Sequence, residues 1–207
     1  YRRVHAVMTS PSQIYSQYRT IISILRRLSH KAVDGTVLPI VRRMISNTAD
    51  SSTITGTTET NYDLNSTITK ELMRAGFSIH LRAVGNHSSP TNGTPAASVL
   101  FKIKLGDTVV TTFNALNVNS VRSNDSFFIE AYIVVKSTGA SGTVQGFGYI
   151  GLIDNISLTT QLQDIQVNAS TTSLDTIINQ VLQIGVIHGR TDENSYLINF
   201  VVDVMQS

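Results

Sequence analysis

From Phe77 to the C-terminal end of the sequence, apolar and polar residues alternate in a series of short runs. Residues 77–83 and 100–105 are two examples, and in the second Phe101, Ile103 and Leu105 alternate with lysines. Because successive side chains of a strand point to opposite faces, each run has one apolar face and one polar face. Turns rich in Gly, Asn, Ser and Thr separate the runs at intervals typical of a β-sandwich.

The runs that follow this pattern are predicted to be strands at 62–69, 77–84, 98–105, 108–113, 126–136, 143–153, 160–167, 177–188 and 195–205. This number of antiparallel strands favours a mainly β, jelly-roll sandwich of two four-stranded sheets. Segment 126–136 is apolar on both faces, which predicts cover by the opposed sheet on one side and by the N-terminal helix or a second subunit on the other. We therefore predict that Phe128, Tyr132 and Val134 pack against another subunit.

The composition restricts the chemistry that is available. Charged residues make up 14% of the 207 residues, compared with about 25% in a typical soluble domain. Cysteine is absent, which excludes disulfides, thiolate metal sites and a Cys nucleophile. The apolar runs are too short to cross a bilayer, and the first residues lack the apolar core of a signal peptide. We expect no membrane partner.

The N-terminal part is basic and helical in pattern. Residues 12–30, with Ser12 as the cap, place apolar residues on one stripe at helical spacing and basic residues opposite. Residues 1–50 hold eight basic and two acidic residues, a net charge of +6, so the remainder carries −4 of the overall +2. Either the arginines are solvated on a packing helix, or the arm meets nucleic acid or a partner. The predicted contact residues are Arg2, Arg3, Arg19, Arg26, Arg27, Lys31, Arg42 and Arg43.

Three regions follow from these patterns. Residues 1–46 are predicted to be a basic arm with the amphipathic helix and a short second helix from Pro39 through Ile45. Residues 47–61 have no apolar period and are predicted to be a linker or an extended edge segment. Residues 62–207 are predicted to be the sandwich.

Several runs together resemble a known family over about residues 62–207. They are Gly76-Phe-Ser-Ile-His-Leu-Arg, Leu100-Phe-Lys-Ile-Lys-Leu-Gly-Asp, the long run 127–136 and the closing run from Tyr196. Their order resembles the jelly-roll domains of virion structural proteins such as phage head fibres, decoration proteins and tail appendages. A basic arm ahead of a jelly roll is also similar to small icosahedral capsid proteins.

The resemblance implies a subunit of a virion that assembles with copies of itself, as a trimer or a capsid shell. It implies that the N-terminal arm anchors to neighbouring subunits or to packaged nucleic acid. It supplies no catalytic residues and no cofactor.

The search for chemical motifs leads to the same expectation. None of the five histidines has the spacing of a metal site, and no Gly-x-Ser-x-Gly elbow is present. The G-x-G-x-x-G spacing at 146–151 lies inside a strand run and does not open a helix. We predict no catalytic, cofactor-binding or metal-binding residue and no enzyme activity.

Two alternatives remain open. One is a receptor- or carbohydrate-binding module with its site in loops 86–95 or 137–142, although the chain contains no Trp. The other is a hydrolase whose Ser, His and Asp residues meet across the fold.

Overall fold

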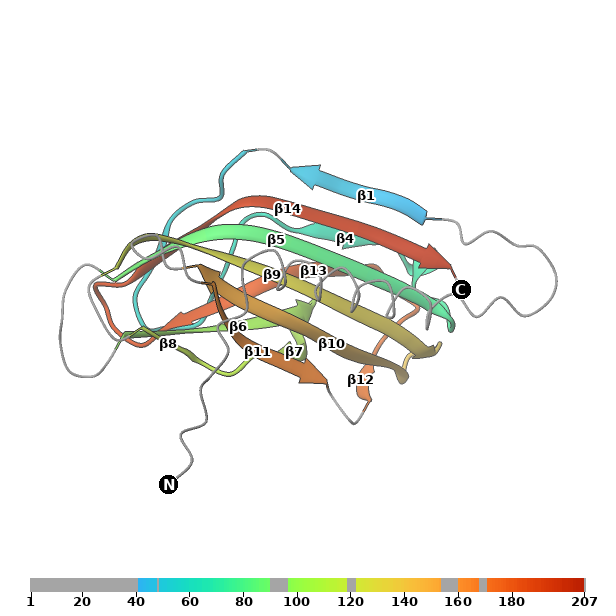
Figure 1. The fold of residues 1–207 in the computed structure, drawn as a ribbon. Coiled ribbons are helices and arrows are strands. Elements are labelled where there is room, and N and C mark those ends of the chain that lie inside the picture. Colours follow the sequence, from blue (N-terminus) through green and yellow to red (C-terminus); the bar gives the residue numbers. More distant parts are fainter. Residues whose placement is uncertain are drawn as a thin grey trace, which may run out of the picture. The chain divides into compact units, whose positions relative to one another are not determined.

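The alternating segments form two antiparallel β-sheets that lie face to face (Figure 1). The structure is a computed structural model, and it describes residues 41–47, 49–89, 97–118, 122–153, 160–167 and 171–206. The main path of sheet A is β1 (Val41–Asn47), β14 (Asn194–Gln206), β5 (Phe77–Ser89), β9 (Arg122–Ser137), β10 (Gly142–Ile153) and β11 (Thr160–Val167). Short strands β2 (Ile54–Thr55) and β12 (Thr172–Leu174) pair with β14 and β10.

Sheet B covers the inner face of sheet A. Its main path is β3 (Thr60–Asn61), β13 (Gln180–His188), β6 (Ala97–Leu105) and β7 (Thr108–Thr112). Strands β4 (Ser66–Ile68) and β8 (Leu116–Val118) pair with β13 and β6, and a single 3-10 turn spans Lys70–Leu72. Strand β5 pairs with β14 in one sheet, and β6 pairs with β13 in the other, so the chain is wound as nested antiparallel pairs.

The strand content confirms the predicted mainly β sandwich of about eight antiparallel strands. Within the described residues, eight strands have seven residues or more: β1, β5, β6, β9, β10, β11, β13 and β14. The described sheets hold eight and six strands rather than the predicted four each. Six of the eight long strands lie in sheet A and two in sheet B, and short strands complete both sheets. Six of the predicted strands, 77–84, 98–105, 108–113, 143–153, 160–167 and 195–205, match β5, β6, β7, β10, β11 and β14 closely.

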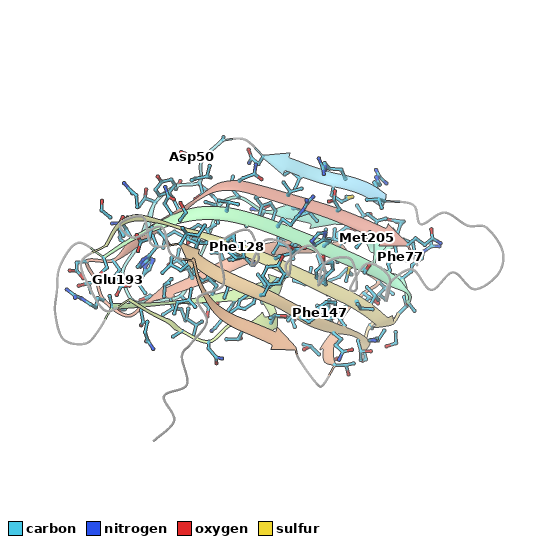
Figure 2. All side chains as sticks on the ribbon, viewed as in Figure 1. Asp50, Phe77, Phe128, Phe147, Glu193 and Met205 are labelled. Atoms are coloured by element: carbon cyan, nitrogen blue, oxygen red, sulfur yellow. The ribbon has the colours of Figure 1, made fainter. Side chains whose placement is uncertain are left out.

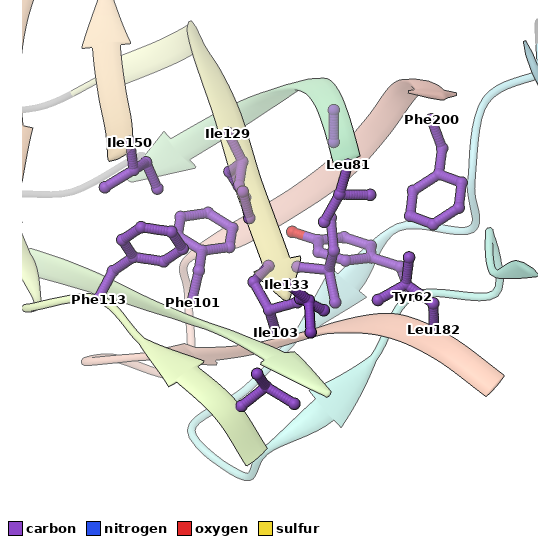
Figure 3. Close-up of a cluster of buried hydrophobic side chains, with 14 of the residues drawn as sticks. Tyr62, Leu81, Phe101, Ile103, Phe113, Ile129, Ile133, Ile150, Leu182 and Phe200 are labelled. Atoms are coloured by element: carbon purple, nitrogen blue, oxygen red, sulfur yellow. The ribbon is translucent and has the colours of Figure 1, made fainter. Parts of the chain in front are cut away.

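The core lies between the two sheets and is built from the inward positions of the alternating runs (Figure 3). Phe101 of β6 and Phe127 of β9 are fully buried, with ring centroids 4.7 Å apart. Burying a side chain of this size stabilises the fold by about 1.5–3 kcal/mol. Gly146 of β10 brings the sheets closest, since a Cβ at this position would lie 2.7 Å from Val110 Cγ1 and 2.9 Å from the Val110 carbonyl oxygen.

Strand β1 corrects a prediction. The helix predicted from Pro39 through Ile45 is wrong over residues 41–45, which form a strand paired with β14. A register shift between Arg43 and Ile45 marks a β-bulge, and Met44 and Ile45 both pack against the core. Pairing with the edge of β14 gives residues 41–45 hydrogen-bond partners that a short isolated helix would lack. The stabilisation from this pairing outweighs the local helical pattern. The amphipathic helix predicted for 12–30 lies outside the described residues.

Residues 47–61 run along the sandwich. Strand β2 pairs with β14 and strand β3 pairs with β13, as the interpretation of an extended edge segment predicts. The backbone N–H of Ser51 donates to the carbonyl of Leu197 at 2.8 Å. The end of the arm predicted at residue 46 falls inside strand β1. In the part of the chain that the structure describes, no helix is long and apolar enough to cross a membrane.

Candidate functional site

One row of side chains crosses sheet A on the face that points away from sheet B. Register pairs Arg43 of β1 with Asp203 of β14, Asp203 with His80 of β5, His80 with Tyr132 of β9, and Tyr132 with Phe147 of β10. Along β9 the odd-numbered residues from 127 to 135 are buried in the core. The even-numbered residues between them point to the opposite face. We call this surface the outer A face, and it comprises His80, Arg82, Phe128, Glu130, Tyr132, Val134, Phe147, Tyr149 and Asp203.

Aromatic rings form a ladder along this row. The rings of His80 and Tyr132 stack with centroids 4.2 Å apart and planes 6° from parallel. Tyr132 stacks in turn on Phe147, with centroids 5.1 Å apart and planes at 10°. Side chains of a sheet stand roughly perpendicular to it, so these rings direct their faces at one another along the sheet. Tyr149 meets Phe128 edge to face at 6.0 Å (Figure 2 labels Phe128 and Phe147).

The Glu130 carboxylate lies at the centre of the outer A face and accepts three hydrogen bonds. His80 Nε2 and the Tyr132 hydroxyl each donate at 2.7 Å, and the Tyr149 hydroxyl also donates. Burial alone would raise the pKa of Glu130, but the hydrogen bonds from His80 and Tyr132 outweigh it and lower the pKa. Glu130 is therefore ionised near neutral pH, and its charge is satisfied within the face.

Asp203 joins three strands in the same way. It accepts from Arg43 Nε at 3.1 Å and from Arg82 Nη2 at 2.7 Å. The Asp203 side chain is 9% exposed, whereas Arg43 and Arg82 are 59% and 43% exposed. The carboxylate is thus neutralised below the surface by two cations that remain partly in water.

Phe128 packs against a glycine on the neighbouring strand. It is the cross-strand neighbour of Gly151 in β10, and a Cβ at Gly151 would overlap the Phe128 ring. The Phe128 ring therefore occupies the space that a side chain at position 151 would fill.

The outer face of sheet B has a different character. Glu59 accepts from Lys102 Nζ at 2.6 Å and from Lys104 Nζ at 3.0 Å, and these two hydrogen bonds lower its pKa. Gly185 of β13 adds no side chain there, and Asn61 and Glu59 are its nearest neighbours. Among the described residues this face carries the Glu59, Lys102 and Lys104 ion pairs and no stacked pair of aromatic rings, so the two outer faces of the sandwich are not equivalent.

The predicted packing residues come together on the outer A face. Phe128, Tyr132 and Val134 are half-buried on the side of β9 that faces away from the core. Glu130 and Phe147 belong to the same surface, but sequence reasoning did not select them. The sequence feature that could have identified them is their position on the outward-facing side of the predicted strands 126–136 and 143–153.

The predicted basic contact residues fall mostly outside the described residues, and only Arg42 and Arg43 can be placed. Both are exposed on strand β1, and Arg43 is engaged with Asp203. The described residues hold no group of three His, Asp or Glu side chains that could bind a metal ion. No cofactor-binding residue was predicted, and that expectation stays a prediction.

A serine and a histidine do meet in the structure, as the hydrolase alternative requires. Ser195 Oγ lies 2.9 Å from His188 Nε2. Their relative exposures are 0% and 1%, so a substrate carbonyl cannot reach the Ser195 hydroxyl in this arrangement. This pair belongs to a buried network at one end of the sandwich.

No protein-family model and no curated protein sequence matches the chain. Among solved structures it is similar to the infectious bursal disease virus VP2 subviral particle protein, with 11% identity and a TM-score of 0.33, over 84% of this chain and 34% of that one. The chain thus spans about a third of that protein. It is also similar to the CBM2 module of the evolved Dit of Lactobacillus casei BL23 phage J-1, with 10% identity and a TM-score of 0.36, over 83% of this chain and 99% of that one.

A third similar structure is the seed lectin of Lotus tetragonolobus, with 10% identity and a TM-score of 0.37, over 86% of this chain and 97% of that one. The neighbours thus include a viral particle protein, a phage module and a lectin. These likenesses are distant, and the sandwich is established by the strand pairing itself.

Proposed function

We propose that this protein is a virion structural subunit that assembles with copies of itself into a capsid or a virion surface layer, and that the outer A face is its intersubunit surface. The observation that carries the assembly is the aromatic ladder of His80, Tyr132 and Phe147 on a face that sheet B does not cover. The virion setting comes from the resemblance of residues 62–207 to jelly-roll virion proteins.

The charges of the outer A face suit burial against a partner. Glu130 has three donors, and Asp203 has two. Covering a carboxylate is costly when its charge is left unpaired, and much less costly when its hydrogen bonds are already made. Interface cores are enriched in aromatic residues and Arg and depleted of Asp and Glu. The outer A face has the aromatic residues and Arg82, and both of its carboxylates are already paired.

A second copy of the chain is the partner that fits. Arg43 and Arg82 balance Asp203 and Glu130 across the surface, so two copies meet without net repulsion. Edge-to-edge pairing through β1 is disfavoured, since its bulge and the neighbouring Arg42 and Arg43 protect the free edge. The aromatic ladder favours broad contact through the sheet face.

The carbohydrate-binding alternative has less support on the outer A face. A sugar ring packs against the exposed face of an aromatic ring, whereas Tyr132 has its two faces occupied by His80 and Phe147. Residues 86–95 and 137–142 contain no aromatic except His87, which lies in β5 and is fully buried. Residues 90–95 of the predicted loop lie outside the described residues. A glycan-binding monomer remains an outcome that the assembly experiment would detect.

The basic arm has a separate proposed role. Residues 1–46 would anchor the subunit to a neighbour or to packaged nucleic acid through their Lys and Arg side chains. Nucleic-acid binding by the full chain should weaken steeply as salt is raised, with little dependence on sequence. No binding of single- or double-stranded oligonucleotides at low salt would remove the nucleic-acid role and leave anchoring to a neighbour.

The assembly experiment is size-exclusion chromatography with light scattering on the full chain and two variants. Phe147→Asp places a charge on the outer A face, and Leu100→Asp is the matched control on the outer side of β6 in sheet B. Wild type and Leu100→Asp should form trimers or larger particles, and Phe147→Asp should dissociate. Circular dichroism must show the same fold in all three.

Two results would contradict the proposal. A wild-type protein that stays monomeric at high concentration would remove self-assembly. Assembly that survives Phe147→Asp and is lost in Leu100→Asp would assign the interface to sheet B.

A further inference from the structure

A buried polar cluster closes the end of the sandwich where β5 ends and β14 begins. Glu193 marks this end in Figure 2, and Phe77 and Met205 mark the opposite end. We call the cluster the polar pin, and it comprises Tyr62, His87, His188, Glu193 and Ser195. Each of these residues is at most 1% exposed.

In the first branch of the polar pin each group donates to the next in a fixed order, and the tautomer of His188 determines that order. His188 Nδ1 lies 3.2 Å from the Gly56 carbonyl oxygen, which can only accept, so Nδ1 carries a proton. In the neutral ring Nε2 is then an acceptor, and Ser195 Oγ donates to it at 2.9 Å. Because the Ser195 proton is used there, the Tyr62 hydroxyl donates to Ser195 at 2.5 Å.

A second branch runs beside the first. His87 Nε2 donates to a Glu193 carboxylate oxygen at 3.0 Å, and the other oxygen accepts from the Ser98 backbone N–H at 3.3 Å. The rings of His87 and His188 lie 5.8 Å apart. The two branches are thus close enough for a charge on one to act on the other.

The pin ties the two sheets together. His87 and Ser195 belong to β5 and β14 of sheet A, and His188 and Ser98 belong to β13 and β6 of sheet B. The Ser195–His188 hydrogen bond therefore crosses the gap between the layers. Glu193, in the turn between β13 and β14, bridges His87 of sheet A and Ser98 of sheet B. At this end of the sandwich, hydrogen bonds between buried polar groups hold the two sheets together. In the rest of the core, packing of apolar side chains does so.

We propose that the polar pin is an acid-sensitive latch: proton uptake by His188 breaks the ordered chain of hydrogen bonds and opens this end of the sandwich, while the opposite end stays folded. A second proton on His188 makes Nε2 a donor, and Ser195 must then accept from it. Ser195 can no longer donate to His188, and the imidazolium charge is held in a site closed to water.

The surroundings of His188 favour its neutral form. Burial and the neighbouring His87 lower the pKa of His188, while the Gly56 carbonyl and the Glu193 carboxylate oppose that shift. Other ionisable groups are near: Asp125 of β9 is the cross-strand partner of His87, and in the turn after β13 Arg190 donates to Asp192 at 2.7 Å.

The sign of the pH effect follows from the lowered pKa. An open or unfolded state binds the proton at the ordinary histidine pKa of about 6.5, above that of the folded state. The stabilisation is therefore complete above about pH 6.5 and is lost as pH falls below it. Between pH 7.5 and 5.0 one such histidine can raise the opening equilibrium by up to about thirtyfold.

Hydrogen exchange measured by mass spectrometry on the full chain tests the latch. Protection factors, corrected for the intrinsic pH dependence of exchange, are compared at pH 7.5 and 5.0 for peptides of residues 185–198 and for peptides of 77–82. The protection factors of the 185–198 peptides should fall by up to about thirtyfold between pH 7.5 and 5.0. Those of the 77–82 peptides should change much less.

His188→Gln removes the titrating group and keeps an acceptor near the position of Nε2, so its loss of protection in acid should be much smaller. His5→Gln is the control, because it removes one histidine and leaves all five residues of the polar pin unchanged; this variant should keep the wild-type response of 185–198. Equal protection of 185–198 at both pH values in the wild type overturns the latch whether or not His188→Gln folds. An unchanged acid response in a folded His188→Gln also overturns it.

Discussion

His80 and Tyr132 stack across strands β5 and β9, with ring centroids 4.2 Å apart, and both donate a hydrogen bond to the same oxygen of Glu130. The shared acceptor holds the two rings parallel, and the stacked rings shield the carboxylate from water. Packing and hydrogen bonding thus stabilise the same arrangement of His80, Tyr132 and Glu130 on the outer A face.

Glu130→Gln should destabilise the protein by about 1.5–3 kcal/mol, the range for hydrogen bonds to a charged group. Because its folded pKa is lowered, Glu130 contributes stability above its unfolded pKa of about 4.5, and that stability is lost as pH falls through the folded pKa. Urea unfolding from pH 7 to 3 should show a shallower acid decline in the variant. Parallel curves for wild type and variant would show that the Glu130 charge does not stabilise the fold.

Asp203→Asn should cost about 1–2 kcal/mol, because one buried carboxylate then loses its charge-assisted hydrogen bonds to Arg43 and Arg82. Arg43→Gln should change stability by no more than about 0.5 kcal/mol, since the Arg43 side chain is mostly in water. The free energies of unfolding of the two variants give the comparison. A larger loss for Arg43→Gln would mean that the cation on β1, and not the buried carboxylate, holds these strands together.

Gly146→Ala should destabilise the sandwich by about 1–3 kcal/mol or more, the usual cost of overfilling a packed interior. The new Cβ would meet backbone and side-chain atoms of β7, which cannot move without separating the sheets. Gly185→Ala is the control, because its nearest neighbour is the end of the Asn61 side chain at 3.0 Å, and this side chain can rotate away. Thermal unfolding of both variants checks the difference, and equal melting temperatures would contradict the close approach of the sheets at Gly146.

Tyr62→Phe should cost about 1 kcal/mol, since Ser195 loses a buried donor. Burial raises the pKa of Tyr62, so the wild type should also lose stability as pH rises above the ordinary tyrosine value of about 10. The variant should lose less over that range. A double-mutant cycle with Ser195→Ala measures the coupling, and strictly additive losses would mean that the two hydroxyl groups do not interact.

The strands of the sandwich could be predicted because their pattern is local. In β5, β6, β10 and β14, one residue in two faces the core, and burial of that face is the main stabilising term whatever the partner strand is. The two apolar faces of 126–136 led to the prediction that Phe128, Tyr132 and Val134 pack against another subunit. The structure places them on the face away from the core, and the subunit contact stays a prediction. Residues 41–45 were predicted wrongly, since a short run with three apolar residues, Val41, Met44 and Ile45, fits a helix and an edge strand equally well.

Tertiary structure alone decided which side chains meet. Strand register joins Asp203 to Arg43, 160 residues away, and the packing of the two sheets joins Ser195 to Tyr62, 133 residues away. Alternation assigns a residue to a face, but it does not say which strands are neighbours or how they are aligned. The sequence by itself therefore determined a two-layer β protein with apolar residues on an outer face. The pairing of distant strands decided the Glu130 and Asp203 networks and the polar pin, because hydrogen bonds and ring stacking require positions that are correct to within a fraction of an ångström.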